Sequence, residues 1–215
     1  MKGLNKFKSS PDNHDFMEKD HIARFLRNHK TGADNLGRRA LASIIAQYPG
    51  GTVVDAACGT CVNWEVFREM AVPCSYIGVD RSKDFLAHAK ELYGDEIEVR
   101  EGYVQELPFE DDEVDVVVMR HIVEHLQEGY EDAIREGLRV AEKELVLIFF
   151  LEPSNKDEDE VIESEPDENG CTYFWNTYSY TKLVTFLSQF GYQVTYGQVA
   201  TPGAAHVDTI LRIKK

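Results

Sequence analysis

Two short segments carry residue types that can hold a nucleotide-like cofactor. An apolar run, residues 52–57, leads into a turn that contains Gly59, and a second apolar run, residues 76–79, ends at Asp80. Asp80 follows Gly59 by 21 positions, close to the roughly 20 residues that separate a nucleotide-binding turn from the acid that binds a ribose. A carboxylate can accept hydrogen bonds from both ribose hydroxyls, and backbone amides at a helix start can meet the rest of the ligand. The spacing therefore predicts a site for an adenosine-bearing cofactor.

Two histidines, His121 and His125, follow a third apolar run, residues 114–119. Histidine titrates near neutral pH, so either side chain could take a proton from a hydroxyl or an amine. Both are predicted as catalytic residues, with packing at a helix start as the alternative for His125. The same segment matches the zinc pattern H-x-x-E-H. It begins at a strand end and not within a helix, where two ligands would share a face, so we predict no metal site.

A C-x-x-C motif, Cys58 to Cys61, follows the first apolar run. This spacing also occurs in thiol redox proteins, so redox chemistry stays an alternative. The Trp that usually precedes such a motif is absent here. The turn also holds one of the three glycines of a dinucleotide fingerprint, which argues against a nicotinamide dehydrogenase.

The elements that must position these residues alternate between strands and helices from residue 52 onward. The runs VDVVVM and ELVLIFFL are apolar at consecutive positions, as strands buried on both faces of a parallel sheet must be. Near the C-terminus, YQVTYGQVA and HVDTILRIKK are too close for a parallel crossover, so one of them runs antiparallel. We predict an α/β fold with a doubly wound, mostly parallel seven-stranded Rossmann-like sheet and one antiparallel strand near its edge. Strands are expected near 52–57, 76–80, 96–100, 114–120, 144–151 and in the two last runs, and helices near 16–28, 33–48, 62–70, 82–93, 130–142 and 179–190.

The predicted domain organisation has two parts. Residues 1–48 are expected to form a tail and a helical cap, and residues 49–215 a Rossmann-like domain with an acidic insertion or lid at 152–177. Its acidic part, EPSNKDEDEVIESEPDENG, holds almost no core-forming residues, which fits a solvated loop or a mobile lid. The aromatic residues that follow either join the core or wall a substrate pocket. They are Tyr173, Phe174, Trp175, Tyr178 and Tyr180.

Composition limits the partners. The chain has 215 residues, 43% of them hydrophobic, and a net charge of −15, which suits one globular domain and offers no basic cluster for nucleic acid. No apolar run is long enough to span a bilayer, and the N-terminus lacks the apolar core of a secretory signal. Four cysteines are few for a disulfide scaffold, so we expect a cytoplasmic protein that contacts neither nucleic acid nor membrane. The oligomeric state is left open.

In combination, the segments VVDAACGT, YIGVD and EGYVQELPFEDDEVDVVVMRHIVEHL resemble the class I S-adenosylmethionine-dependent methyltransferases, especially those that act on small molecules. The resemblance runs from about residue 50 to the C-terminus. It implies S-adenosylmethionine as cofactor and in-line methyl transfer to a small-molecule acceptor, in which the protein mainly aligns the reactants. A non-catalytic protein that binds the same cofactor is the alternative.

The resemblance also assigns roles to particular positions. It places Asp55 near the methionine part of the cofactor, Asp80 on the ribose, and Arg120 and His121 at the floor of the methyl-transfer pocket. The chain departs from the family at Ala57 and Cys61, where glycine is usual, and at Tyr103, where an acid is usual. The full set implied for the cofactor is Asp55, Ala57, Cys58, Gly59, Asp80, Arg81, Tyr103, Val104, Arg120 and His121.

Overall fold

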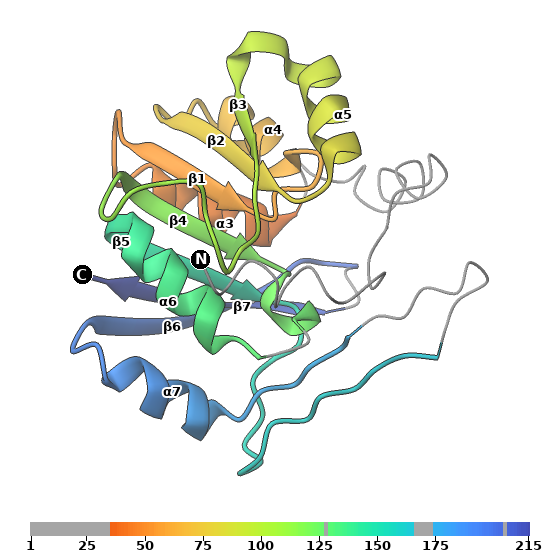
Figure 1. Cartoon of the computed structure of the whole chain (residues 1–215), viewed down its shortest axis with the longest axis vertical. Coiled ribbons are helices and arrows are strands. Elements are labelled where there is room, and N and C mark those ends of the chain that lie inside the picture. The colour runs from red at the N-terminus through yellow and green to blue at the C-terminus, as the bar shows by residue number, and fades with distance from the viewer. Residues whose placement is uncertain (1–34, 127–128, 166–173, 204–205) are drawn as a thin grey trace.

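The computed structural model describes residues 35–126, 129–165, 174–203 and 206–215, and its centre is a seven-stranded sheet (Figure 1). The strand order is β3-β2-β1-β4-β5-β7-β6. Neighbouring strands are parallel except where β7 pairs with β5 and with β6. This confirms the predicted doubly wound sheet with one antiparallel strand near its edge. The strands are β1 (Thr52–Ala56), β2 (Ser75–Asp80), β3 (Glu98–Glu101), β4 (Val114–Arg120), β5 (Ala141–Phe149), β6 (Gln193–Ala200) and β7 (Val207–Lys214).

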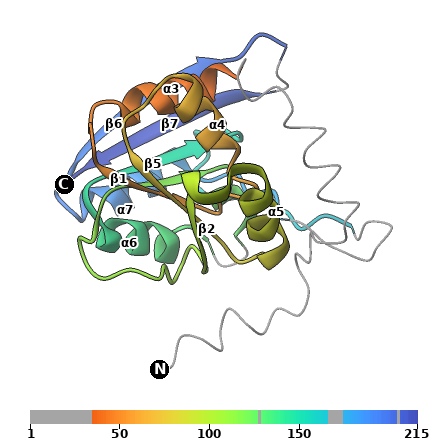
Figure 2. The same cartoon turned by 90° about the horizontal axis from the view of Figure 1, so that it is seen from above.

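Helices cover both faces of the sheet, as Figure 2 shows for α3 and α6. Neighbouring residues of β1 point to opposite faces, so Val53 joins the core under α3, α4 and α5, and Val54 joins the core under α6 and α7. Central strands are therefore buried on both sides, which explains their unbroken apolar sequence. The helices are α3 (Leu36–Ile45), α4 (Val62–Glu69), α5 (Lys83–Tyr93), α6 (Glu131–Val140) and α7 (Tyr180–Ser188), with short 3₁₀ turns at Gly94–Glu96 and Val123–His125.

Short polar side chains begin three of these helices. The side chains of Asn35, Ser82 and Ser179 each accept a hydrogen bond from the backbone amide three residues later, which satisfies an otherwise unpaired donor. Several boundaries differ by one to three residues from the sequence prediction, and the junction of α6 and β5 is the clearest case. Helix α6 ends at Val140 and β5 starts at Ala141, whereas we expected a helix to 142 and a strand from 144. Pairing of Ala141 with Val114 of β4 fixes this junction.

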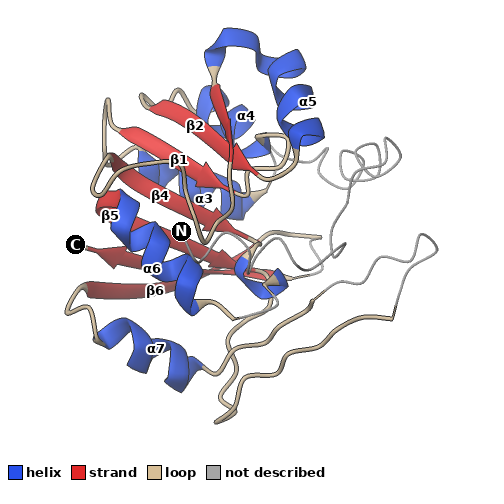
Figure 3. Cartoon of the chain, viewed as in Figure 1, coloured by secondary structure: helices blue, strands red, loops and turns tan. Residues whose placement is uncertain are grey.

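The carboxyl ends of the parallel strands lie at one edge of the sheet. Strand β7 runs the other way, so its first residues reach the same edge (Figure 3). Residues that follow β1, β2 and β4 therefore gather with residues at the start of β7. Functional side chains are expected at such an edge in open α/β sheets.

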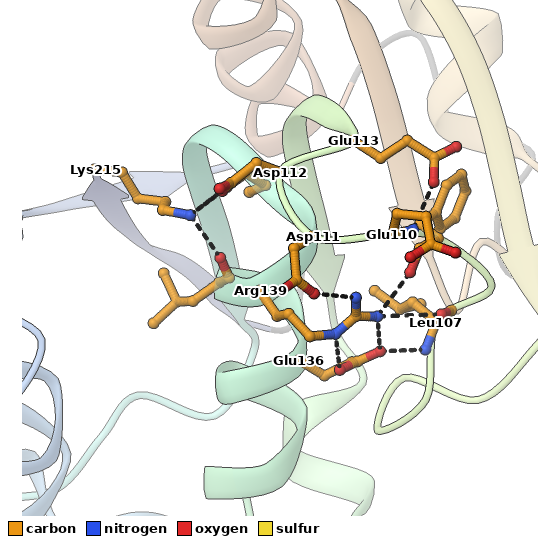
Figure 4. A network of polar contacts seen from close by, with 11 residues as sticks. Leu107, Glu110, Asp111, Asp112, Glu113, Glu136, Arg139 and Lys215 are labelled. Carbon is orange, nitrogen blue, oxygen red and sulfur yellow. Dashed lines mark hydrogen bonds and ion pairs between the residues drawn. The ribbon is translucent and has the colours of Figure 1, made fainter.

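The connection between β3 and β4, residues 102–113, is tied to α6 through one arginine (Figure 4). Arg139 donates to the carboxylates of Glu136 (2.8 Å) and Asp111 (2.8 Å) and to the carbonyl oxygen of Phe109 (2.9 Å). A guanidinium group has five N–H donors in a fixed fork, which suits it to hold several acceptors at once. The tie fixes the loop that also carries Tyr103 and Val104.

The acidic insertion folds back on itself where it is described. Glu160 bridges to Thr177 and Glu163 to Phe174, both antiparallel, so residues 152–165 lie against residues 174–177.

The predicted helix at 16–28 lies outside the described residues, and α3 is the described part of the helix predicted at 33–48. The domain boundary at residue 48 stays a prediction. None of the helices in the described ranges has the length and apolar character that crossing a bilayer requires.

Candidate functional site

The turn after β1 and the end of β2 meet, as the sequence spacing predicts. The amide of Gly59 donates to Oδ2 of Asp80 (2.9 Å), and the amide of Ser82 donates to Oδ1 of the same carboxylate (2.9 Å). Asp80 is 8% exposed. The backbone of Arg81 also hydrogen-bonds to this carboxylate, so about one of its four lone-pair positions remains for a hydroxyl of a ligand, and a second hydroxyl would have to share or displace a backbone donor. Ala57, Gly59 and Cys61 all have φ near +60°, the left-handed conformation that glycine adopts most readily.

The C-x-x-C thiols lie under this turn, against β2. A Cβ atom built on Gly78 would lie 2.7 Å from Sγ of Cys61 and 2.8 Å from Sγ of Cys58. Burial, with Cys61 beside it, raises the pKa of the Cys58 thiol well above its usual value. The thiolate is the reactive form, so a thiol held protonated does not fit the redox alternative. The two cysteines instead fill the space beneath the turn.

Asp55, at the end of β1, lies inside a chain of polar contacts. Its Oδ2 accepts from the hydroxyl of Tyr76 (2.5 Å) and the amide of Asn63 (3.0 Å), and Asn63 accepts from Nε of Arg38 (3.2 Å). Burial raises the pKa of Asp55, and burial together with the charge of Arg120 lowers the pKa of Arg38 to about 10. The chain connects α3, α4, β1 and β2 below the cofactor turn.

The loop after β3 lies beside Asp80. The amide of Gly102 donates to the carbonyl oxygen of Asp80 (3.1 Å), and the next residues are Tyr103 and Val104. Tyr103 is half-buried, Val104 is buried in the core, and Arg81 is exposed. The structure thus brings the predicted ribose-side and adenine-side residues to one place.

A second group of polar side chains surrounds Asp208, near the start of β7. Nε2 of His121 lies 2.7 Å from Oδ1 of Asp208, and Nε2 of His206 lies 3.3 Å from the same oxygen. Arg120 donates from Nη2 to Oδ2 (3.1 Å). Nε of Arg120 is buried and has no hydrogen-bond partner among the described residues. We call His121, His206 and Asp208, with Arg120, the Asp208 cluster.

Within the Asp208 cluster the side chains of Arg120 and Asp208 are buried, that of His121 is largely buried and that of His206 is partly exposed, and burial sets the protonation of His121. Burial lowers the pKa of His121 to about 3, and the charge of Arg120 acts in the same direction. Burial would raise the pKa of Asp208, but hydrogen bonds and charges from His121 and Arg120 outweigh it and hold the value at about 2. At neutral pH His121 is a neutral imidazole and Asp208 a carboxylate. Because a carboxylate only accepts, His121 carries its proton on Nε2, and its Nδ1 has the free lone pair.

His125 lies apart from the Asp208 cluster. Its Nδ1 donates to the carbonyl oxygen of Phe174 (2.7 Å), and its ring packs against those of Phe150 and Trp175, with centroids 5.3 and 5.1 Å away. The H-x-x-E-H residues therefore do not converge, because His121 turns to Asp208 and His125 to Phe174. The alternative reading of His125 as a packed side chain fits this contact.

The aromatic residues after the insertion divide between core and surface. Phe174 and Tyr178 are buried, Trp175 and Tyr180 are exposed, and Tyr173 lies outside the described residues. A polar hollow of about 390 Å³ lies beside Tyr180 and shares no lining residue with the cofactor turns or the Asp208 cluster. We place the functional site at the strand ends, where the predicted residues meet. The hollow is lined by Glu152, Pro153, Ser154, Asn155, Tyr180 and Tyr196.

Several site residues were missed in the sequence. Asp208 and His206 come from the start of the last strand, 87 and 85 positions after His121. The sequence feature that could have indicated them is the short segment HVD, because it lies at the start of the last strand, where an antiparallel strand reaches the functional edge of the sheet. Arg38 and Asn63 gave no separate signal, since each sits at an ordinary position within a helix.

The comparison with known families and the comparison with solved structures both match methyltransferases. Residues 54–149 match the family model described as a methyltransferase domain. No curated protein matches the chain.

Many solved structures share the fold at low sequence identity. Magnesium protoporphyrin IX methyltransferase from Synechocystis PCC 6803, solved with bound S-adenosylmethionine, is 15% identical, with a TM-score of 0.69 and 94% of each chain covered. A methyltransferase from Aquifex aeolicus is 16% identical, with a TM-score of 0.63 and coverage of 92% of this chain and 98% of that one. The 1,6-didemethyltoxoflavin-N1-methyltransferase of Burkholderia thailandensis, solved with its substrate and S-adenosylhomocysteine, is 15% identical, with a TM-score of 0.63 and coverage of 90% and 86%.

Proposed function

We propose that the chain is a methyltransferase that uses S-adenosylmethionine, and that its acceptor is a small molecule bound beside His121. The match of residues 54–149 to a methyltransferase domain and the shared fold support this proposal. The hydrogen bond from Gly59 to Asp80 carries the proposal, since it joins the two elements that the cofactor needs. When bound, S-adenosylmethionine supplies a methyl group that is already activated on a positively charged sulfur. The task left to the protein is alignment, which can lower a barrier by roughly 7–11 kcal/mol.

The cofactor residues divide into three groups in this proposal. Asp80 accepts from the ribose hydroxyls, and the amides of the turn at Gly59 face the ligand. Arg81 and Tyr103 flank the adenine, and the amide of Val104 meets a ring nitrogen. Asp55 acts through Asn63, because its carboxylate is 2% exposed and already bonded. The proposed set is Asp55, Ala57, Cys58, Gly59, Asp80, Arg81, Tyr103, Val104, Arg120 and His121.

At the acceptor end we assign His121 the main role. Its Nδ1 lone pair can accept a hydrogen bond from an acceptor hydroxyl or amine and so orient it. A pKa of about 3 makes His121 a weak base before methyl transfer. The methylated oxygen or nitrogen is far more acidic than its precursor, so His121 can take the proton as transfer proceeds. Asp208 fixes the tautomer of His121. His125 packs against Phe150, which also contacts the ring of His121.

Charge supports a small acceptor. A net charge of −15 disfavours the phosphate contacts on which nucleic-acid binding depends. Two of the structural neighbours are named for small-molecule substrates, a magnesium porphyrin and a toxoflavin precursor. The described cysteines are free thiols, which fits a reducing compartment, and a cytoplasmic location is part of the same proposal.

Calorimetry with S-adenosylmethionine tests the cofactor assignment. We expect Asp80→Ala to weaken binding at least about tenfold, because it removes a charged hydrogen-bond acceptor. Asp84→Ala is the matched control, since Asp84 is an exposed carboxylate in the first turn of α5 and its loss changes the net charge equally. Equal affinities of the Asp80 and Asp84 variants would refute the ribose assignment.

A screen for S-adenosylhomocysteine release with small-molecule acceptors tests the acceptor class. A protein that only binds the cofactor would take it up without releasing that product with any acceptor. With an acceptor in hand, His121→Ala should lower kcat by about 100-fold or more. An unchanged kcat would remove His121 from the mechanism.

A further inference from the structure

Three potential metal ligands converge in the Asp208 cluster. Nε2 of His121, a ring nitrogen of His206 and a carboxylate oxygen of Asp208 all lie within 4.8 Å of one another. They come from three places in the chain, namely the end of β4, the turn before β7 and the second residue of β7. Two imidazole nitrogens approach the same oxygen, Oδ1, at 2.7 and 3.3 Å.

These separations suit a bound cation. Metal–ligand bonds of about 2.0–2.2 Å at tetrahedral or octahedral angles place neighbouring ligand atoms about 2.8–3.6 Å apart. The two nitrogen–oxygen separations lie close to that range. A single divalent ion could therefore take the place of the proton between His121 and Asp208 and bring in the second imidazole nitrogen as a further ligand.

We propose that His121, His206 and Asp208 form a binding site for one divalent transition-metal ion, with open coordination positions facing the methyl acceptor. Two imidazoles and one carboxylate are ligands that Mn²⁺, Fe²⁺, Co²⁺, Ni²⁺ and Zn²⁺ accept, whereas Mg²⁺ and Ca²⁺ prefer oxygen ligands. The proposal revises the sequence prediction of no metal site. The pattern H-x-x-E-H supplies one of the ligands, and the other two come from the C-terminal strand.

Neighbouring residues orient the carboxylate of Asp208, add positive charge near it and pack against the two imidazoles. Arg120 holds Oδ2, which leaves Oδ1 turned toward the imidazoles, as outer hydrogen bonds commonly orient metal ligands. The first turn of α3 lies against the same Oδ2, since a Cβ atom built on Gly37 would be 1.7 Å from it. Arg120 and Arg38 oppose a positive ion by charge. The rings of His121 and His206 both pack edge-on to Phe150, at 5.2 and 5.8 Å, which limits their rotation.

The functional consequence rests on the proposed methyl transfer. A metal ion at this position would hold an acceptor oxygen and lower the pKa of its hydroxyl, so that the proton would pass to water before transfer. With the ion bound, His121 would be a ligand through Nε2 and carry its proton on Nδ1, so it would orient the acceptor and would not act as the base. This suits a phenol, an enol or a carboxylic acid, each of which can bind a metal through oxygen. Binding of the ion itself depends on neither the cofactor nor the acceptor.

Metal binding by the full chain without cofactor is the test. After treatment with a chelator, equilibrium dialysis against Zn²⁺ and optical titration with Co²⁺ should show one tightly bound ion per chain. His206→Ala should weaken binding at least tenfold, and Asp208→Asn should act in the same direction. His88→Ala is the control, because His88 lies on α5 and pairs with Glu91 away from the cluster.

Two results would overturn the proposal. One is wild-type protein that retains no stoichiometric ion, and the other is equal affinity in the His206 and His88 variants. Calorimetry with S-adenosylmethionine on His206→Ala should give wild-type affinity, which shows that the variant is folded. Since that measurement needs no metal and the dialysis needs no cofactor, failure of the metal site and failure of the methyltransferase assignment give separate results.

Discussion

Glu124 is a buried carboxyl group that makes stability depend on pH. Its Oε1 accepts from the amides of Phe150 (2.6 Å) and Leu151 (3.4 Å), while Oε2 has no partner among the described residues. Burial raises the pKa of Glu124 to about 7 from the ordinary 4.5. The folded state therefore keeps a proton that the unfolded chain releases. The stability that this proton supplies is complete below about pH 4.5 and is lost as the pH rises through about 7.

Glu124→Gln should remove this dependence. Relative to wild type, we expect the variant to gain up to about 3 kcal/mol of unfolding free energy between about pH 5 and pH 8, which corresponds to the shift in pKa. Urea unfolding at both pH values measures the difference. Glu91→Gln, at an exposed position of α5, should show no such trend. A pH-independent difference between wild type and Glu124→Gln would refute the raised pKa.

His121 should stay neutral well below neutral pH in the metal-free protein. Burial and Arg120 hold its pKa at about 3, so the Nε2–H tautomer is expected from about pH 8 to pH 5. Nitrogen NMR of the imidazole distinguishes this form from the imidazolium. A charged ring at pH 5 would show that Asp208 outweighs burial.

The sequence predicted some of these residues and missed others for a physical reason. Gly59 and Asp80 were found because two adjacent parallel strands deliver them, and local spacing encodes that arrangement. Asp208 reaches His121 only because β7 inserts beside β5 in the antiparallel direction, which brings together residues 87 positions apart. No local pattern encodes that distance. The positive φ at Cys61 was equally hidden, because the sequence shows a cysteine where glycine is usual.

At the scale of elements, the surface of β2 supports the cofactor turn. Gly78 leaves room for the thiols of Cys58 and Cys61, and a methyl group there would overlap both. Gly78→Ala should therefore shift the turn, weaken S-adenosylmethionine binding at least about tenfold and destabilise the fold by about 1–3 kcal/mol. Gly197→Ala, in exposed β6, meets no atom within 4 Å and is the control. Calorimetry and thermal unfolding report the two effects, and normal binding by Gly78→Ala would contradict this role of β2.

Element types were predictable, and their ends less so. Consecutive apolar residues identified β4 and β5, and helical periodicity identified α4 to α7. The junction of α6 and β5 was placed wrongly because no glycine or proline separates Val140 from Ala141. There, pairing with β4 decides where the helix stops, and this information lies outside the local sequence.

At the scale of the whole molecule, charge should affect how the cofactor arrives. S-adenosylmethionine carries a net positive charge, and its product S-adenosylhomocysteine does not. A chain with a net charge of −15 attracts the first at long range. Salt screens such attraction over about 10 Å at 0.1 M. Stopped-flow fluorescence should therefore show association of S-adenosylmethionine slowing with salt more than that of the product, and equal slowing would count against steering.

The position of β7 has a consequence for synthesis on the ribosome. The cofactor turns, between residues 52 and 104, emerge early, and the strands that carry them are already neighbours. Asp208 emerges with the last strand, which must enter between β5 and β6 before the carboxylate meets His121. If the proposed assignment holds, a nascent chain could bind its methyl donor before Asp208 completes the acceptor side, and turnover would begin only after the final strand is in place.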